Sequence, residues 1–244
     1  MSVMHGMDWD KGLTLILHTP GGITNATETI VEYLLEKFEF IEVVIPTFAM
    51  SAGTMISLAA NRIIMGRQSQ LGPIDPQMPI GGRAVSARAV TDQFKEAKDQ
   101  ILGNVKLAHV WAPILQSLGP SLIKEAENAL DYSEKMVANW LIKRMLSDHP
   151  DSENKGTEIA AFFNRSEDHK SHGARISRES ARSVGVIIDD LESDQDFQDL
   201  ILTAYHLVTM VYEKSPAAKV IYSNLGNVWI KNTGNINPQA QKRR

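Results

Sequence analysis

The chain has 244 residues, of which 43% are apolar and 22% are charged. This length and composition suffice for one sizeable α/β core, or for a core with an appendage, and they exclude a disordered regulator. The formal charge of −4 provides no general attraction to nucleic acid or to anionic lipid. Because the chain has no cysteine, a disulfide scaffold, a thiolate nucleophile and a cysteine-based zinc site are excluded as well.

Neither a leader nor a membrane span is expected from the N-terminal part of the chain. The first residues lack the basic and apolar regions of a signal peptide. Residues 43–61 carry no charge and are numerous enough to cross a bilayer, but Pro46 and Gly53 interrupt them, which favours a buried strand, a turn and a buried helix. We therefore expect a cytoplasmic protein with no membrane span and no nucleic-acid partner.

Strands and helices are expected to alternate over the first 65 residues. Short apolar runs at residues 13–17, 42–46 and 62–65 predict buried strands. Between them, apolar residues recur at helical spacing within residues 30–38, and small and apolar residues fill 51–60, so each interval predicts a helix. This alternation predicts an α/β fold whose mainly parallel sheet is covered by helices on both faces.

The C-terminal half is expected to be helical. Residues 69–83 contain three prolines and three glycines, which predicts a long irregular loop. Helices are then predicted at residues 84–102, 105–117, 121–130, 133–146, 156–163, 178–183 and 197–212. The remaining residues predict a loose tail. The expected organisation is therefore a single domain over residues 1–213 and a C-terminal tail over residues 214–244.

Two turns, each between a predicted strand and a predicted helix, are the segments that bear most on chemistry. They are His18–Gly22 (HTPGG) and Ala49–Thr54 (AMSAGT). Backbone N–H groups in such turns can point at a developing oxyanion, and glycine leaves the approach open. Ser51 occupies the position at which a nucleophile would benefit. Serine is also a common helix N-cap, and from this turn alone that simpler role is favoured.

A third motif, Ser69–Gln77 (SQLGPIDPQ), completes a set that resembles the serine dehydrogenase proteinase family. That family is related to signal peptide peptidase A and has the Clp-protease/crotonase fold. The resemblance covers Leu13 to about Leu102 closely and residues 171–185 more faintly.

The resemblance implies a serine peptidase in which Ser51 is the nucleophile. The backbone N–H groups of Gly21 or Gly22, together with that of Ala52, would form the oxyanion hole. The resemblance also implies assembly into a homo-oligomer.

A serine nucleophile needs a general base, and several residues compete for that role. The loop that holds the catalytic histidine in Clp protease holds Asp75 here, which could orient the base. Signal peptide peptidase A uses a lysine from a later helix, which directs attention to Lys98 and Lys95. We expect Lys98 to be the base because it lies at the edge of an apolar helix face, where partial burial would favour the neutral amine. Both lysines are also compatible with a solvated helix face, and His172 is the next candidate.

The function predicted from these observations is that of a serine endopeptidase of the Ser-Lys type, acting on a peptide or protein substrate. No cofactor is expected, since the chain lacks the phosphate-binding and dinucleotide-binding glycine motifs. Two alternatives remain open. One is a catalytically inactive binding or scaffold protein with the same fold. The other is an acyl-CoA-type enzyme in which the paired N–H groups would bind a thioester oxygen.

Overall fold

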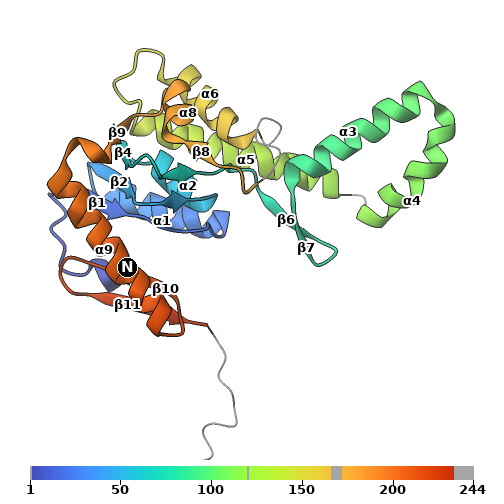
Figure 1. Cartoon of the computed structure of the whole chain (residues 1–244). Coiled ribbons are helices and arrows are strands. Elements are labelled where there is room, and N and C mark those ends of the chain that lie inside the picture. The colour runs from blue at the N-terminus through green and yellow to red at the C-terminus, as the bar shows by residue number, and fades with distance from the viewer. Residues whose placement is uncertain (1, 120, 166–171, 234–244) are drawn as a thin grey trace, which may run out of the picture. The chain divides into compact units, whose positions relative to one another are not determined.

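The computed structural model describes residues 2–119, 121–165 and 172–233. These residues form two compact units, which are coloured along the chain in Figure 1. The larger unit is Gly12–Ser193, and the smaller unit combines the residues before Gly12 with those after Ser193. The division differs from the expected single domain over residues 1–213, because helix α9 (Gln195–Lys214) belongs to the smaller unit.

A four-stranded parallel sheet forms the centre of the larger unit, in the order β1-β2-β4-β9. Its strands are β1 (Leu13–Ile16), β2 (Ile41–Ile45), β4 (Arg62–Met65) and β9 (Ile188–Asp190). The predicted α/β fold with a parallel sheet is therefore confirmed, and its first three strands lie where the apolar runs indicated. The sequence did not indicate β9, because this strand has three residues and two of them are aspartates.

Burial explains why the central strands are continuous apolar runs. Both β2 and β4 have neighbours on each side, and Val43, Ile45, Ile63 and Met65 have no exposed surface. Burying a side chain of this size stabilises the fold by about 1.5–3 kcal/mol. Strand β1 lies at the edge of the sheet and alternates between half-buried and exposed side chains.

Helices cover this sheet and extend beyond it. Those of the larger unit are α1 (Thr24–Lys37), α2 (Ala52–Leu58), α3 (Ala87–Gly103), α4 (Ala108–Leu118), α5 (Leu122–Lys143), α6 (Ser152–Asn164) and α8 (Arg178–Ser183). Helix α5 packs against α6, α3 and α2. In Figure 1, α3 and α4 project away from the sheet of this unit. No helix in the described part of the chain is long and apolar enough to span a membrane.

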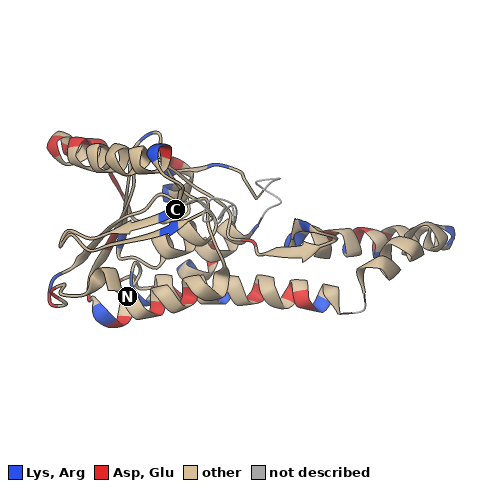
Figure 2. Ribbon diagram, turned by 90° about the horizontal axis from the view of Figure 1, so that it is seen from below, with Lys and Arg blue, Asp and Glu red and all other residues tan. Residues whose placement is uncertain are grey.

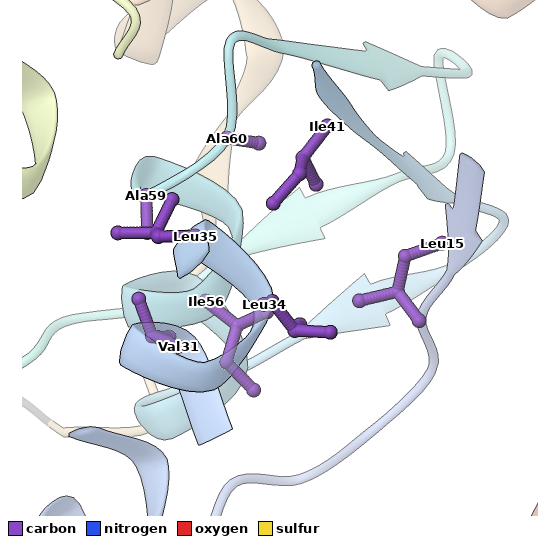
Figure 3. A pocket seen from close by; sticks show the side chains of 8 residues that line it. All are labelled: Leu15, Val31, Leu34, Leu35, Ile41, Ile56, Ala59 and Ala60. Carbon is purple, nitrogen blue, oxygen red and sulfur yellow. The ribbon is translucent and has the colours of Figure 1, made fainter. Parts of the chain in front are cut away.

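An apolar pocket lies where α1 and α2 meet the sheet (Figure 3). It is lined by Leu15, Val31, Leu34, Leu35, Ile41, Ile56, Ala59 and Ala60. All eight side chains are aliphatic, so the pocket offers no group that could donate, accept or transfer a proton. The pocket therefore belongs to the packing of the core.

Helix α5 is continuous, so the predicted break at Tyr132 is wrong. Tyrosine neither fixes the backbone nor lacks an N–H group, and its cost in a helix is small. The buried residues Ala126, Leu130 and Val137 continue one face across the expected break. The Tyr132 hydroxyl instead donates a hydrogen bond to Glu28 of α1.

Residues 69–83 were expected to form an irregular loop, and this prediction is wrong as well. They contain β5 (Gln70–Leu71), β6 (Gln77–Ile80) and the start of β7 (Arg83–Ser86). Strands β6 and β7 form a two-stranded antiparallel hairpin. Gly81 and Gly82 make its turn with φ angles of 57° and 79°, a conformation that glycine adopts at low cost. The proline in β6 is tolerated because both strands are edges.

The smaller unit contains a hairpin where a loose tail was expected. Its elements are the 3-10 helix Ser2–Met4, α9, β10 (Ala217–Tyr222) and β11 (Val228–Asn232). Strands β10 and β11 pair antiparallel. The side-chain amide of Asn227 donates to the carbonyl oxygens of His5 and Val3, at 2.9 and 3.4 Å, and so joins the two ends of the chain that build this unit.

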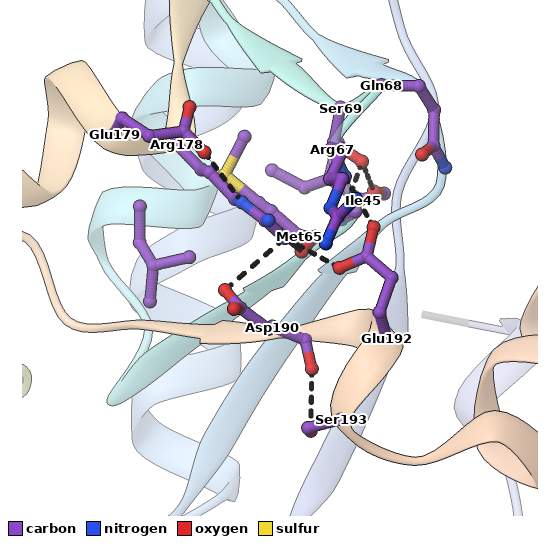
Figure 4. A network of polar contacts seen from close by, with 12 residues as sticks. Ile45, Met65, Arg67, Gln68, Ser69, Arg178, Glu179, Asp190, Glu192 and Ser193 are labelled. Carbon is purple, nitrogen blue, oxygen red and sulfur yellow. Dashed lines mark hydrogen bonds and ion pairs between the residues drawn. The ribbon is translucent and has the colours of Figure 1, made fainter.

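A cluster of ion pairs lies at the carboxyl end of β4 (Figure 4). Arg178, whose side chain is 8% exposed, donates to the Met65 carbonyl oxygen at 3.0 Å, to Glu192 at 2.6 Å and to Glu179 at 2.9 Å. The second carboxylate oxygen of Glu192 accepts the N–H of Arg67 at 2.7 Å. Burial alone would lower the pKa of Arg178, but its hydrogen bonds to Glu192 and Glu179 outweigh that effect and raise it.

We predict that Glu192→Gln makes the stability of the protein less sensitive to acid. Burial raises the pKa of Glu192, but hydrogen bonds from Arg67 and Arg178 overcome this and hold it below 4.5. A lowered carboxyl pKa stabilises the fold above the ordinary value, and this contribution is lost as the pH falls through the folded-state value. At neutral pH the variant should lose on the order of 1–3 kcal/mol of unfolding free energy.

Urea titrations at several values between about pH 6 and about pH 3 measure this dependence. Glu127→Gln is the matched control, because Glu127 is exposed and pairs with Lys124 on the same helix. Equal acid sensitivity in Glu192→Gln and in the unaltered protein would contradict the prediction.

Candidate active site

A second sheet of the larger unit brings distant segments to one edge. It contains β3 (Phe48–Ala49), β5 and β8 (Ile176–Ser177), in the order β3-β5-β8. Strand β5 runs parallel to β3 and antiparallel to β8. The chain therefore leaves β3 and β5 at the same edge at which it enters β8. Ser51 follows β3, Asp75 follows β5 and His172 precedes β8, so all three residues belong to segments that meet at this edge.

The glycine turn after β1 joins the same edge. Thr19 forms a parallel bridge with Ala49, and the Met50 N–H donates to the Thr19 carbonyl oxygen at 3.0 Å. The buried hydroxyl of Thr54 donates to the Ala49 carbonyl oxygen at 2.7 Å and accepts the N–H of Gly72 at 2.9 Å. These contacts fix the turn before Gly21, the turn at Ser51 and the start of the Asp75 segment relative to one another.

Ser51 has a strained backbone. Its φ and ψ are 52° and −114°, and it is the one non-glycine residue with positive φ among those that the structure describes. Such a conformation costs on the order of 1–3 kcal/mol, and it is enriched at functional sites. The Ser51 hydroxyl makes no capping bond to α2, although serine at this position usually does. The N-cap interpretation of Ser51 is therefore wrong, and the hydroxyl is not used by the helix.

Gly21 packs directly against Ser51. A Cβ built on Gly21 would lie 2.9 Å from the Cβ of Ser51 and 3.1 Å from the carbonyl oxygen of Met50. Gly21 also has a φ of 120°, so glycine is required for both space and conformation. The glycine turn thus approaches the serine too closely to leave room for a side chain at position 21.

Two backbone N–H groups beside Ser51 have no hydrogen-bond partner in the described structure. The N–H of Gly21 donates to the Thr19 hydroxyl at 3.1 Å and is therefore occupied. No such bond is made by the N–H groups of Gly22 and Ala52, whose residues are adjacent, since a Cβ on Gly22 would lie 3.8 Å from that of Ala52. Of the two glycines proposed from the sequence, Gly22 is therefore the better donor to an oxyanion.

Asp75 and His172 form a pair although they lie 97 residues apart in the chain. Their side chains meet at 2.8 Å between the carboxylate Oδ1 and the imidazole Nδ1. The Asp75 side chain is fully buried, and its second oxygen accepts a hydrogen bond from Gln77 at 3.2 Å. The His172 side chain is 28% exposed. A carboxylate that holds Nδ1 leaves the more accessible imidazole with Nε2 for proton transfer.

The structure does not provide the environment expected for Lys98. Lys98 and Lys95 are both exposed on α3, so the predicted partial burial of Lys98 is wrong. The apolar face of α3 is narrow there, with Ala97 as its buried residue, and alanine is too small to cover a neighbouring lysine. Without burial there is no desolvation of the amine, which removes the physical reason for assigning Lys98 as the base.

His18 is engaged by its own surroundings. Its Nδ1 lies 2.5 Å from the Thr47 hydroxyl, and its ring contacts that of Phe48 with centroids 4.0 Å apart. Partial burial lowers the pKa of His18. Thr47 and Phe48 thus hold the ring of this histidine just after the end of β1.

Serine hydrolases combine a serine on a strand-to-helix turn with backbone N–H donors and a His–Asp pair, and this chain brings segments with these features to one edge of the short sheet. The model of the ClpP-like SDH-type serine proteinases matches residues 3–190. The chain belongs to that family, as the motifs suggested.

Two curated proteins of Methanocaldococcus jannaschii are similar to the chain. Uncharacterized protein MJ0137 is 30% identical over 181 residues, which cover 74% of this chain and 54% of that protein. Uncharacterized protein MJ1495 is 32% identical over 132 residues, which cover 53% of this chain and 45% of that protein. The chain therefore spans about half the length of the curated relatives it matches.

Solved structures with some likeness to the chain include two variants of the 1510-N membrane-bound stomatin-specific protease. The first is 16% identical with a TM-score of 0.42, over 92% of this chain and 78% of that one. The second, in complex with a substrate peptide, is 18% identical with a TM-score of 0.43, over 91% of this chain and 73% of that one. Both TM-scores are low, so the family assignment rests on the family match.

We predict that Gly21→Ala disrupts the site and Gly22→Ala does not. An alanine at position 21 would combine strained positive φ with a collision against Ser51, and should destabilise the protein by about 1–3 kcal/mol. At position 22 the added methyl group meets Ala52 at an ordinary contact distance. Thermal unfolding and labelling of Ser51 by a fluorophosphonate measure both effects, and equal behaviour of the two variants would contradict the prediction.

Proposed function

We propose that the protein is a serine endopeptidase whose nucleophile is Ser51. The observation that carries the proposal is the strained backbone of Ser51, whose hydroxyl makes no capping bond to α2, at the edge of the sheet where the segments of Asp75 and His172 also meet. A strained serine costs stability, and a scaffold protein would gain nothing from it. An acyl-CoA-type enzyme would need the backbone donors but neither the serine nor the His–Asp pair.

In the proposed reaction, the Ser51 hydroxyl oxygen attacks the carbonyl carbon of the scissile peptide bond. Its proton passes to Nε2 of His172, while Asp75 remains ionised and accepts the hydrogen bond from Nδ1–H. The N–H groups of Gly22 and Ala52 stabilise the oxyanion of the tetrahedral intermediate. His172 then protonates the leaving amine, which leaves an acyl-enzyme that water hydrolyses with the same histidine as base.

We predict that Ser51→Ala abolishes labelling by a fluorophosphonate and that His172→Ala lowers its rate at least about 1,000-fold. Lys98→Met should leave the rate unchanged, because Lys98 is exposed. Mass spectrometry of the labelled peptide identifies the modified residue, and circular dichroism verifies that each variant is folded. Loss of labelling in Lys98→Met with full labelling in His172→Ala would overturn the assignment of the base.

We also propose that the protein assembles into a homo-oligomer through the arm formed by α3 and α4. Helix α4 has no buried residue in the single chain, and it contains no Asp, Glu, Lys or Arg (Figure 2). Val105 and Val110 are 76% and 62% exposed, and Leu102 and Ile114 are exposed beside them. Contact with a second copy would remove this apolar surface from water.

We predict that Val105→Glu and Val110→Glu dissociate this oligomer without unfolding the subunit, because both side chains are exposed in the single chain. Sedimentation velocity at micromolar concentration should show the unaltered protein as a species heavier than 27.1 kDa and the variants at that mass. Gln93→Glu is the control, since it adds the same charge at an exposed polar position of α3. A purely monomeric unaltered protein would refute assembly.

A further inference from the structure

We propose that Arg178 is a positioning residue, which holds His172 against Asp75 through the ion-pair cluster at the end of β4. The inference rests on the proposed role of His172, but its structural part concerns the His172–Asp75 hydrogen bond alone. Arg178 follows β8 directly, and His172 lies four residues before the first residue of that strand. An anchor at position 178 therefore fixes the segment that carries the histidine.

The anchor fixes the orientation of the Arg178 side chain, because its buried guanidinium has several hydrogen-bond partners (Figure 4). Its guanidinium reaches the Met65 carbonyl oxygen, Glu192 and Glu179 at 3.0, 2.6 and 2.9 Å. It also lies 3.3 Å from Asp190 of β9. A planar guanidinium with several donors satisfies these groups in one orientation only, whereas apolar packing at the same place would tolerate sliding.

The same cluster holds the segment that leads to Asp75. Glu192, which binds Arg178, also accepts the N–H of Arg67 at 2.7 Å. Arg67 belongs to the turn between β4 and β5, in which Ser69 accepts the Gly66 N–H at 3.0 Å and donates to the Ile45 carbonyl oxygen. The next strand, β5, ends four residues before Asp75. The partly buried carboxylate of Glu192 thus connects the segment of the histidine with the segment of its carboxylate partner.

An additional anchor is needed because β5 and β8 are very short. They share two residue pairs, Gln70 with Ser177 and Leu71 with Ile176. So few pairs fix register weakly, and a shift along β8 would move His172 by several ångströms relative to Asp75. The cluster at Arg178 prevents such a shift, since the residue beside β8 cannot slide without breaking its ion pairs.

The test uses Arg178→Lys, which keeps the charge beside Glu192 but cannot reproduce the planar set of donors. In protein labelled with nitrogen-15 histidine, the Nδ1–H proton of His172 should give a far-downfield resonance through its hydrogen bond to Asp75. We expect this resonance to be lost in Arg178→Lys and the rate of Ser51 labelling to fall about tenfold or more. In a His172→Ala background, Arg178→Lys should cause no further decrease in that rate.

Arg62→Lys is the matched control. Arg62 is the first residue of β4, whereas Met65, which the Arg178 cluster contacts, is the last. Arg62 bridges Glu42 and Asp189 and therefore lies at the other end of β4 from that cluster. This variant should keep both the resonance and the labelling rate. Should Arg178→Lys fail to fold by circular dichroism, Glu192→Gln weakens the same cluster from its other side and should lose the resonance instead.

The outcomes separate the two proposals. An unchanged His172 resonance in folded Arg178→Lys or Glu192→Gln overturns the positioning role of Arg178, as does its equal loss in Arg62→Lys. Loss of the resonance in protein whose Ser51 never reacts with the fluorophosphonate leaves the positioning role intact and refutes the proposed peptidase function. A further fall of the labelling rate in the His172→Ala background would show that Arg178 acts through something other than His172, and would overturn the proposal.

Discussion

The candidate site depends on the pairing of β5 with strands on both sides. Leu71 pairs with Ala49 of β3 and with Ile176 of β8, so one residue in the middle aligns three segments that are far apart in the chain. Each strand has two residues, which provide few hydrogen bonds. The geometry therefore depends on side chains around the sheet, above all Thr54 between β3 and β5 and Arg178 after β8.

The short sheet and the contacts around it hold Ser51 in its strained conformation. The Ser51 carbonyl oxygen accepts the N–H of Met55, and the next turn of the helix is almost wholly buried. A strain of about 1–3 kcal/mol is small compared with the free energy gained by burying the side chains of α2 and β4. Gly21 packs against the Cβ of Ser51, and this close contact prevents the turn at Ser51 from relaxing.

The candidate site lies within the larger unit. The family match over residues 3–190 nearly coincides with the larger unit, which contains the sheet, both turns and the His–Asp pair. The smaller unit lies mostly outside that match and consists of one long helix, a hairpin and the residues at the start of the chain. Within the larger unit, α4 is the least buried helix, which is consistent with a surface that a single copy does not complete.

The sequence by itself determined the strands, helices and turns whose causes are local. Apolar runs specified β1, β2 and β4, glycine and small residues after a strand indicated the two turns, and the resemblance to a family pointed to Ser51. The sequence could not determine that His172 pairs with Asp75, because the two residues are brought together by long-range pairing of strands too short to leave a pattern. It also misjudged the burial of Lys98, since burial depends on what packs above a helix face and not on the spacing within it. Only the tertiary structure decided these points, because a hydrogen bond between distant side chains exists only once the folded backbone has brought them together.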